Sequence, residues 1–303
     1  MKKILVTGGT TFVSRYVAEY YVQKEYEVFV LNRNHKPQSE GVTLIEADRQ
    51  NLGETLKNYH FDAVLDITAY AEHDINALLD AISSFENYIF ISSSAVYPEY
   101  GKQPFTEEMQ VGENRFWGKY GIDKQAAEAA LRKRVPDAYI LRPPYLYGPM
   151  NNVYREAFVF DCAMQKRKFY LPGDGGMRLQ FFHVKDMCRF IDIILEKKPN
   201  QHIFNVGNKE AISVKDWVAL CYQVVGEEAG FVNVYQEMEQ RNYFCFYDYE
   251  YYLDVSKQCE LMPETESLVT GLQEAFMWYQ ANQDKVNKKD YFDFIDNNLI
   301  IQN

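Results

Sequence analysis

The chain has 303 residues, of which 47% are hydrophobic and 25% are charged, values typical of folded globular domains. Its formal net charge is −11 at pH 7, and this negative field repels phosphate backbones and anionic membrane surfaces. The composition excludes collagen-like, coiled-coil and disordered chains, and it predicts no nucleic-acid and no membrane partner. The length allows two modest domains or one large one.

The cysteines and histidines show no metal-ligand or disulfide spacing. The five cysteines are widely separated and contain no C-x-x-C pair, so we expect buried thiols, no metal and a metal-independent chemistry. No apolar run approaches the roughly 18 residues that a membrane span needs, and the opening segment does not read as a targeting signal. We therefore expect a cytoplasmic protein.

The first half of the chain alternates short apolar runs with longer helical patterns, which is typical of βαβ units around a parallel sheet. The expected strands are 3–7, 27–31, 42–46, 63–67, 88–92 and 138–141. The expected helices are 12–24, 51–58, 73–84 and 118–134. This pattern predicts an α/β fold built on a doubly wound parallel sheet.

After Arg142 the alternation of apolar and helical segments ends, because prolines and glycines interrupt it at 143–149 and again at 172–176. Short strands are expected at 203–206 and 231–235, and helices at 213–225 and 268–281. We predict a dinucleotide-binding domain at 1–145, to which 177–206 returns, and a smaller C-terminal substrate lobe formed by 146–176 and 207–303.

The first strand runs into a glycine-containing turn that opens a helix, which is where a dinucleotide binds in such sheets. Small residues let the backbone approach a pyrophosphate, while the helix N-terminus supplies free N–H donors. Thr11 and Ser14 stand where the fingerprint usually has glycine, so an ordinary tight turn is the alternative. The candidate cofactor residues of this turn are Gly8, Gly9, Thr10, Thr11, Phe12 and Val13.

The end of the second strand bears on the choice of cofactor. Asn32 replaces the acidic residue that would repel a 2′-phosphate, and Arg33 adds a guanidinium that can pair with one. NADP is therefore favoured over NAD, with a solvated loop charge as the alternative role of Arg33. Asp48 is the candidate contact for the adenine amino group, and Thr68 and Ala69 join the cofactor site.

Tyr120 and Lys124 lie four residues apart in a predicted helix, so they share one helical face. A phenol with the ordinary pKa of about 10 is a poor base, but a neighbouring ammonium favours the phenolate and lowers that pKa. Both residues are expected at the cofactor as well as in catalysis. The alternative is an exposed pair on a helix surface.

Three serines, Ser92, Ser93 and Ser94, end the apolar strand 88–92. Ligands bind at the carboxyl ends of parallel strands, so these hydroxyls are expected to face the same crevice as the Gly8 turn. One of them can hydrogen-bond a substrate oxygen while Tyr120 moves its proton. Loop capping is the alternative role.

These motifs carry a family resemblance that spans nearly the whole chain. A TGG turn is followed in order by SSSAVY, YGIDKQAAE, LRPPYLYGP, QFFHVKD and FNVG, which resembles the extended short-chain dehydrogenase/reductase family, the NAD-dependent epimerase/dehydratase group. The resemblance implies a Rossmann-type fold, NAD(P) as cofactor and subunits that pair as a homodimer. It implies catalytic roles for Ser93, Tyr120 and Lys124, with Ser94 as the alternative serine.

The chain also departs from the family pattern. Ser94 and Ala95 stand where dehydratases of the family have an Asp-Glu pair, which argues against dehydration. Tyr145 replaces the asparagine of many sugar-nucleotide epimerases, and Leu179-Gln180 replaces an Arg-Asp pair. The candidate substrate residues are Ser94, Tyr145 and Arg178, and for Arg178 a solvated surface charge is the alternative.

The resemblance favours an enzyme whose small-molecule substrate is a nucleotide sugar or a related sugar, epimerised with Tyr120 as general acid/base. An NADP-dependent carbonyl reductase is the close rival. A non-catalytic cofactor-binding or RNA-binding protein is the third reading, since the GGTxF turn is similar to that of atypical members, which include chloroplast stem-loop-binding proteins.

Overall fold

The structure is a computed structural model, which describes residues 2–299, and the chain forms two compact units. The first unit contains the residues up to Leu146 together with Phe181–Lys209 and Leu253–Thr265. The second contains Tyr147–Gln180, Glu210–Tyr252 and the residues from Glu266 onward.

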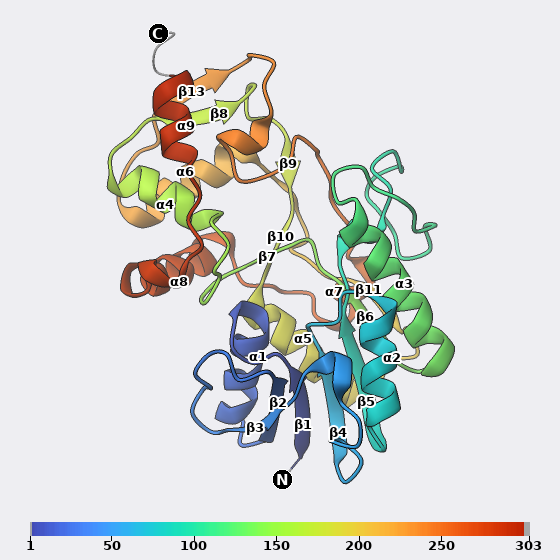
Figure 1. Ribbon diagram of the computed structural model, residues 1–303. Coiled ribbons are helices and arrows are strands. Elements are labelled where there is room, and N and C mark those ends of the chain that lie inside the picture. Colours follow the sequence, from blue (N-terminus) through green and yellow to red (C-terminus); the bar gives the residue numbers. More distant parts are fainter. Residues whose placement is uncertain (1, 300–303) are drawn as a thin grey trace. The chain divides into compact units, whose positions relative to one another are not determined.

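The first unit is built on a seven-stranded sheet with the order β11-β6-β5-β4-β1-β2-β3 (Figure 1). Its neighbouring strands pair in parallel. The strands are β1 (Lys3–Thr7), β2 (Glu27–Asn32), β3 (Val42–Glu46), β4 (His60–Asp66), β5 (Ser84–Ile91), β6 (Tyr139–Arg142) and β11 (Ile203–Asn205). The order reverses between β1 and β4, and ligands of doubly wound sheets bind outside such a point. The predicted doubly wound parallel sheet is confirmed.

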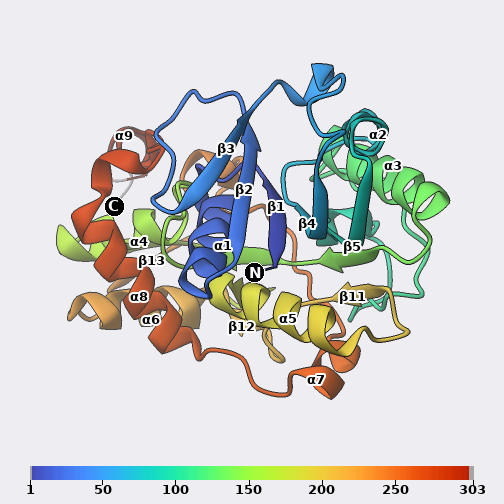
Figure 2. The ribbon, with the colours of Figure 1, turned by 90° about the horizontal axis from the view of Figure 1, so that it is seen from below.

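Helices cover both faces of this sheet, as Figures 1 and 2 show. On one face, α1 (Phe12–Gln23) and α5 (Val184–Lys197) pack with the apolar side chains of the central strands. On the other, α2 (Glu72–Ala81) lies against α3 (Lys119–Arg134) over a second apolar cluster. Because both faces are buried, β1 reads as a continuous apolar run rather than an alternating one.

The structure corrects one helix and one domain boundary. The helix expected at 51–58 is a short 3₁₀ turn, Arg49–Asn51, followed by hydrogen-bonded turns, because Gly53 adopts φ +51°. Residues 253–265, expected in the C-terminal lobe, pack within the first unit, where the Asp254 amide donates to the Phe105 carbonyl. The helix α7 (Ser256–Leu261) follows directly.

The second unit is mainly helical. Its helices α4, α6 and α8 pack against one another, and β8 pairs in parallel with β13 while β9 pairs in antiparallel with β12. Their bounds are α4 (Glu156–Met164), α6 (Val214–Val225), α8 (Leu268–Ala281), α9 (Tyr291–Asn298), β8 (Phe169–Pro172), β9 (Arg178–Leu179), β12 (Ile212–Ser213) and β13 (Phe231–Val234). Two further strands are not part of this unit alone: β7 (Tyr145–Tyr147) spans the boundary between the units, and β10 (Phe181–His183) belongs to the first. Four of the five predicted buried thiols are buried, and Cys259 is half-buried.

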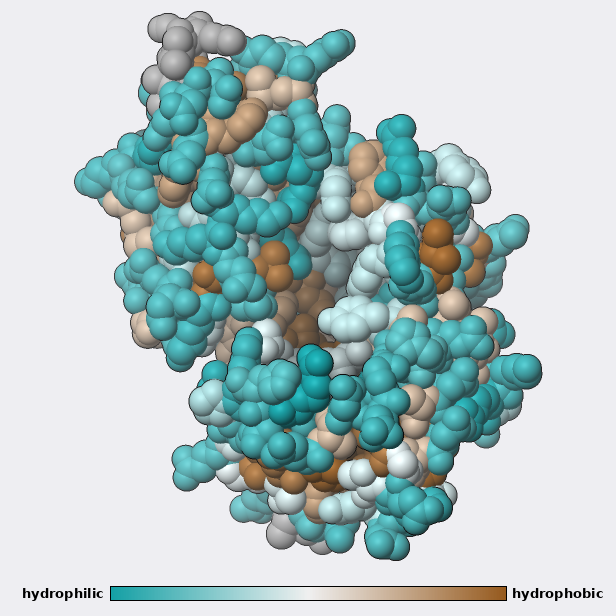
Figure 3. Space-filling model, in the orientation of Figure 1, coloured by the Kyte–Doolittle hydropathy of each residue, from teal (hydrophilic) through white to brown (hydrophobic). Residues whose placement is uncertain are grey.

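Hydrophilic side chains cover most of the face shown in Figure 3. Among residues 2–299, none of the helices combines the length and apolar character that crossing a membrane requires.

Candidate active site

The turn after β1 has a backbone conformation that requires glycine. Gly8 and Gly9 adopt φ +92° and +91°, in the region that side chains rarely enter. A Cβ on Gly9 would also lie 2.5 Å from Cγ1 of Val30, so neither the dihedral nor the space admits a side chain. The turn therefore exposes bare backbone at the switch point of the sheet.

Thr11 and Ser14, which replace the usual glycines, are accommodated without closing the turn. Thr11 has extended dihedrals, and the buried Ser14 hydroxyl donates to the Thr11 carbonyl oxygen at 2.9 Å. No side chain caps the N-terminus of α1 in the described structure, and uncapped amide groups at a helix N-terminus suit an anion. Lys36, which the sequence analysis missed, donates to the Thr11 hydroxyl at 3.2 Å and adds a positive charge here.

A cavity of about 340 Å³ opens beside this turn, within the first unit. Five of the predicted cofactor residues line it: Gly8, Asn32, Arg33, Asp48 and Thr68. The other lining residues are Thr7, Leu31, Ala47, Arg49, Gln50, Tyr70 and Asp74. The other predicted cofactor residues are not part of its lining: Gly9, Thr10, Thr11, Phe12, Val13, Ala69, Tyr120 and Lys124.

The Asn32 side chain holds the wall of the cavity together. Its amide donates to the Gly8 carbonyl at 2.7 Å and to Gln38 Oε1 at 3.0 Å, while its Oδ1 accepts from the Asn34 amide at 2.8 Å. Asn32 thus fastens the turn to the loop after β2. Asp48 has a local role as well, because its Oδ1 accepts from the Gln50 amide at 3.0 Å.

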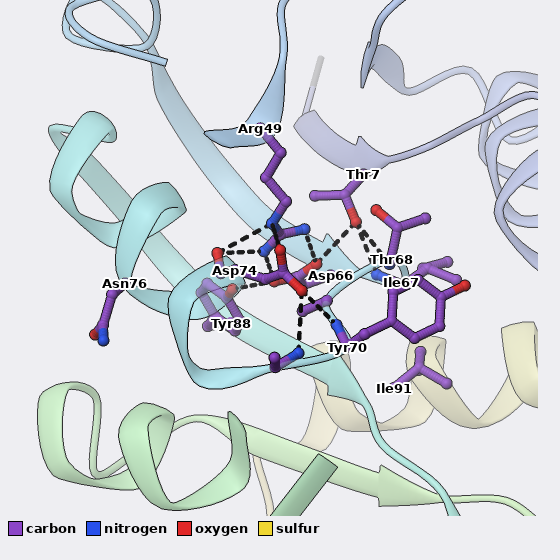
Figure 4. A network of polar contacts seen from close by, with 12 residues as sticks. Thr7, Arg49, Asp66, Ile67, Thr68, Tyr70, Asp74, Asn76, Tyr88 and Ile91 are labelled. Carbon is purple, nitrogen blue, oxygen red and sulfur yellow. Dashed lines mark hydrogen bonds and ion pairs between the residues drawn. The ribbon is translucent and has the colours of Figure 1, made fainter. Parts of the chain in front are cut away.

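A buried polar network (Figure 4) includes three of the residues that line the cavity, Thr7, Arg49 and Asp74. Asp66, fully buried at the end of β4, accepts from Arg49 Nη1 and Nη2 at 2.7 and 2.6 Å. It also accepts from the hydroxyls of Thr7, at 2.8 Å, and Tyr88. Although burial favours the neutral acid, the Arg49 guanidinium and these hydrogen bonds keep the pKa of Asp66 below its ordinary value.

The network extends to the loop after β4. Thr7 Oγ1 accepts from the amides of Ile67 and Thr68 at 2.9 and 3.0 Å. Asp74, in the first turn of α2, accepts from the Tyr70 amide at 2.8 Å and so fixes the loop at its other end. Arg49 donates to the Asp74 carbonyl from Nε and Nη2. The loop that carries Thr68 and Tyr70 is thereby held at both ends.

The structure brings Tyr120 and Lys124 together beside this loop. Lys124 is 2% exposed, and its Nζ donates to the carbonyls of Ala69 and Ile91 at 2.7 and 2.8 Å. The ammonium lies 6.0 Å from the ring centroid of Tyr120, which is 37% exposed. Burial lowers the pKa of Lys124 to about 8, against the opposing charges of Asp66 and Glu128.

The three serines after β5 have different environments. Ser92 is buried and its hydroxyl donates to Glu128 Oε1 at 2.5 Å. Ser94 is also buried, and its backbone amide donates to the Pro143 carbonyl oxygen. Ser93 is partly exposed, and its Oγ accepts from the Ala95 amide at 3.1 Å. Of the three hydroxyls, that of Ser93 is the most accessible to a ligand.

Gly121 allows α3 to approach the serine turn closely. A Cβ at this position would lie 2.5 Å from the Ala95 carbonyl oxygen, so only glycine permits the contact. Tyr120, the preceding residue, is carried to the same turn as Ser93. The predicted serine, tyrosine and lysine therefore come from two separate segments, the turn after β5 and α3, to one edge of the sheet.

A second buried ion pair anchors α3. Glu128 accepts from Arg142 Nε at 2.9 Å and Nη2 at 2.5 Å, and both side chains are almost fully buried. Arg142 also donates to the Tyr97 hydroxyl at 2.8 Å, and Tyr97 donates to Asn205 Oδ1 at 2.7 Å. These bonds tie α3 to β6 and β11, so Tyr120 and Lys124 stand on a rigid support.

The two remaining candidate substrate residues lie in different units. Tyr145 is buried in the first unit, with its ring centroid 6.1 Å from those of Trp117 and Phe181. Arg178 belongs to the second unit, where its Nη2 donates to Glu250 Oε1 and to the Tyr252 hydroxyl, each at 3.1 Å. Within residues 2–299, no group of three or more histidine, cysteine and acidic side chains is arranged to hold a metal.

Known proteins resemble the chain in sequence and in fold. The chloroplast stem-loop binding protein of 41 kDa b from Arabidopsis thaliana is 25% identical over 91% of this chain and 78% of its own length. The UDP-glucose 4-epimerase of Corynebacterium glutamicum is 25% identical over 74% of this chain and 80% of its own. The structure of UDP-glucose 4-epimerase from Thermotoga maritima superposes with a TM-score of 0.75 at 19% identity, covering 93% of this chain and 99% of that one.

The model of the NAD dependent epimerase/dehydratase family matches residues 4–207, more than half of the chain. This stretch contains the glycine turn, the serine turn and the Tyr120–Lys124 helix described above. The chain therefore belongs to the NAD dependent epimerase/dehydratase family.

Proposed function

We propose that the protein is an NAD(P)-dependent nucleotide-sugar epimerase in which Tyr120 is the general acid/base. The observation that carries the proposal is the placement of Tyr120 beside the buried Lys124 ammonium, at the sheet edge that also carries the glycine turn and Ser93. The similarity to named UDP-glucose 4-epimerases supports the sugar-nucleotide substrate.

The residues of the first unit fit a dinucleotide. The positive φ of Gly8 and Gly9 keeps the turn free of side chains, and the helix N-terminus with Lys36 suits a pyrophosphate. The cavity lined by Asn32, Arg33 and Asp48 suits the adenosine half. When bound, the nicotinamide supplies a hydride acceptor that later returns the same hydride.

The side chains account for the movement of the proton. Tyr120 Oη takes the proton of a carbinol hydroxyl as the C–H bond of that carbon breaks, which leaves a ketone on the sugar. Ser93 Oγ hydrogen-bonds the same oxygen and polarises it. After the sugar presents its other face, Tyr120 returns the proton as a new C–H bond forms, and the carbinol is inverted with no net oxidation.

Lys124 acts through charge and position. Its ammonium is fixed by two carbonyl acceptors, so it stays beside the Tyr120 ring rather than moving into solvent. A fixed positive charge favours the phenolate form that accepts a proton. It also suits a hydrogen bond to a cofactor ribose hydroxyl, as the family resemblance implies.

Replacing Tyr120 by phenylalanine tests this proposal. We expect interconversion of UDP-glucose and UDP-galactose, or of another UDP-sugar pair that the wild type turns over, to fall at least 100-fold. NAD⁺ binding should be retained, because only the hydroxyl is removed. Tyr235→Phe, at an exposed position of the second unit, is the matched control. Undiminished turnover in the Tyr120 variant would remove this residue from the mechanism.

We further propose that NADP binds at least as well as NAD. Asn32 places no carboxylate at the end of β2, and Arg33 lines the cavity where a 2′-phosphate would lie. An NADP-dependent carbonyl reductase would use the same residues, but it would consume reduced cofactor stoichiometrically. Following absorbance at 340 nm during turnover separates the two reactions.

The match to a stem-loop binding protein supports a second candidate, a non-catalytic RNA-binding role. The net charge of −11 and the assembled Ser93, Tyr120 and Lys124 side chains favour the enzyme instead. Salt-sensitive binding of a stem-loop RNA near 150 mM salt, with no turnover of any UDP-sugar, would reverse this order. The expected homodimer, paired through a helix bundle that includes α3, and the cytoplasmic location stay predictions.

A further inference from the structure

Tyr70 is a large aromatic side chain left exposed at the edge of the candidate site. It is 54% exposed and follows β4 in the loop that also carries Thr68. Its backbone is fixed, because its amide donates to Asp74 Oδ2 at 2.8 Å. In Figure 4 the ring points away from Asp66 and Arg49. An exposed ring on a fixed backbone is preorganised to receive a ligand.

Tyr70 also connects the two parts of the site. Tyr70 is one of the residues that line the cavity of about 340 Å³, together with Asn32 and Arg33. Its ring centroid also lies 5.2 Å from Lys124 Nζ and 6.3 Å from the centroid of the Tyr120 ring. These residues all belong to the first unit. Tyr70 therefore contributes to the lining of the cavity and also lies beside Tyr120 and Lys124.

We propose that Tyr70 binds the cofactor at its nicotinamide-ribose half and positions that half against Tyr120 and Lys124. A planar ring offers a large contact area with little loss of side-chain entropy, and stacking tolerates a nicotinamide or the face of a ribose. The Lys124 ammonium on the ring further restricts the ring's orientation. This inference rests on the proposed function, since it assumes that NAD(P) occupies the cavity.

Calorimetric titration of two nucleotides into Tyr70→Ala and Tyr70→Phe tests the assignment. ADP probes the adenosine half alone, whereas NAD⁺ also probes the nicotinamide half. We expect Tyr70→Ala to weaken NAD⁺ binding about tenfold and to leave ADP binding within about twofold, consistent with the loss of one stacked ring. Tyr70→Phe should bind both nucleotides like the wild type. Tyr100→Ala, at a position 82% exposed in the same unit, is the control.

The outcomes distinguish this inference from the proposed function. Equal NAD⁺ affinity in Tyr70→Ala and wild type would overturn the role of Tyr70 while leaving the cofactor site intact. Equal weakening of ADP and NAD⁺ would also overturn it, because the ring would then serve the adenosine half or the loop. If NAD⁺ and NADP⁺ fail to bind the wild type, the proposed function fails first. Steady-state kinetics complete the test, since a positioning role predicts a lower kcat in Tyr70→Ala.

Discussion

Two buried arginine–carboxylate pairs stand under the two halves of the candidate site. Arg49–Asp66 lies under the cavity, where the Arg49 side chain keeps 13% of its surface exposed. Arg142–Glu128 lies under the Tyr120–Lys124 helix, where both side chains are at most 5% exposed. The first pair holds the loops that shape the cavity, and the second holds a helix against the sheet. The same kind of ion pair therefore fixes the shape of the cavity in one place and the position of Tyr120 and Lys124 in the other.

The difference in exposure also predicts a difference in energy. Removing one partner of a buried pair leaves an uncompensated charge, whose cost falls when water can reach that charge. Arg49 can be solvated from the cavity after its partner is neutralised, whereas Arg142 cannot. Variants of the two pairs should therefore differ in how much stability they lose. They should also differ in their main functional loss, which is turnover for the Glu128 pair and nucleotide binding for the Asp66 pair.

The largest effect is expected for Glu128→Gln. It leaves the Arg142 charge buried and removes the carboxylate that accepts the Ser92 hydroxyl, so the free energy of unfolding should fall by about 3–5 kcal/mol. Turnover per folded molecule should fall as well, because α3 loses its anchor. Urea unfolding and single-temperature kinetics measure the two effects. The control is Glu86→Gln, at an exposed position of β5. Equal free energies of unfolding for Glu128→Gln and Glu86→Gln would contradict the account.

A smaller loss of stability is expected for Asp66→Asn, about 2–3 kcal/mol, because water in the cavity can solvate Arg49. Its main consequence should be weaker NAD⁺ binding, since Thr7 and Arg49 lose the carboxylate that accepts from both of them. Calorimetry in parallel with Glu128→Gln checks the contrast. Unchanged nucleotide affinity in Asp66→Asn would show that this network does not shape the cavity.

The lysine between the two halves predicts a dependence on pH. Because the pKa of Lys124 is lowered from 10.5 to about 8, the native state binds fewer protons than the unfolded state between these values. Stability contributed by this group therefore rises with pH across that window. Against Lys124→Met, the wild type should gain about 1–3 kcal/mol between pH 7.5 and 10 in the absence of cofactor.

The control for this comparison is Lys133→Met, at an exposed position of the same helix. The wild type and this control should show the same pH dependence of unfolding. Cofactor affinity should move in the opposite direction and fall above about pH 8, as the ammonium is lost. A flat stability difference between wild type and Lys124→Met would place the Lys124 pKa outside the window.

The smallest effect is expected for Arg33→Ala, which changes one exposed contact at the cavity rim. A single exposed ion pair is worth up to about 1 kcal/mol, so NADP⁺ affinity should fall about threefold to fivefold. NAD⁺ affinity should stay within twofold, because NAD⁺ lacks the 2′-phosphate. Equal losses for the two nucleotides would remove Arg33 as the determinant of cofactor choice.

The sheet and the pair Tyr120 and Lys124 follow local patterns that a sequence displays. Apolar runs separated by helical patterns predicted the parallel sheet, and the spacing of four predicted that Tyr120 and Lys124 share a face. The cavity, by contrast, depends on partners distant in the chain. The Arg49–Asp66 ion pair joins a 3₁₀ turn to the end of β4, and no local pattern indicates that these side chains meet.

The missed features have separate physical reasons. Tyr70 lies in an irregular loop, where no periodicity shows whether a ring is buried or exposed. The helix expected at 51–58 fails at Gly53, whose positive φ interrupts the pattern. The helix α5 is not among the expected helices, although its one apolar face gives a helical period in the sequence.

The most direct test of the account is thermal unfolding of the protein, freed of bound nucleotide, with and without NAD⁺ or NADP⁺. A ligand at 100 times its Kd stabilises the native state by about 2.7 kcal/mol, so we expect a clear rise in Tm with at least one cofactor. The same addition should raise the Tm of Tyr120→Phe by a similar amount. An unchanged Tm of the wild type with both nucleotides would contradict the central claim that the glycine turn and its cavity form a dinucleotide site.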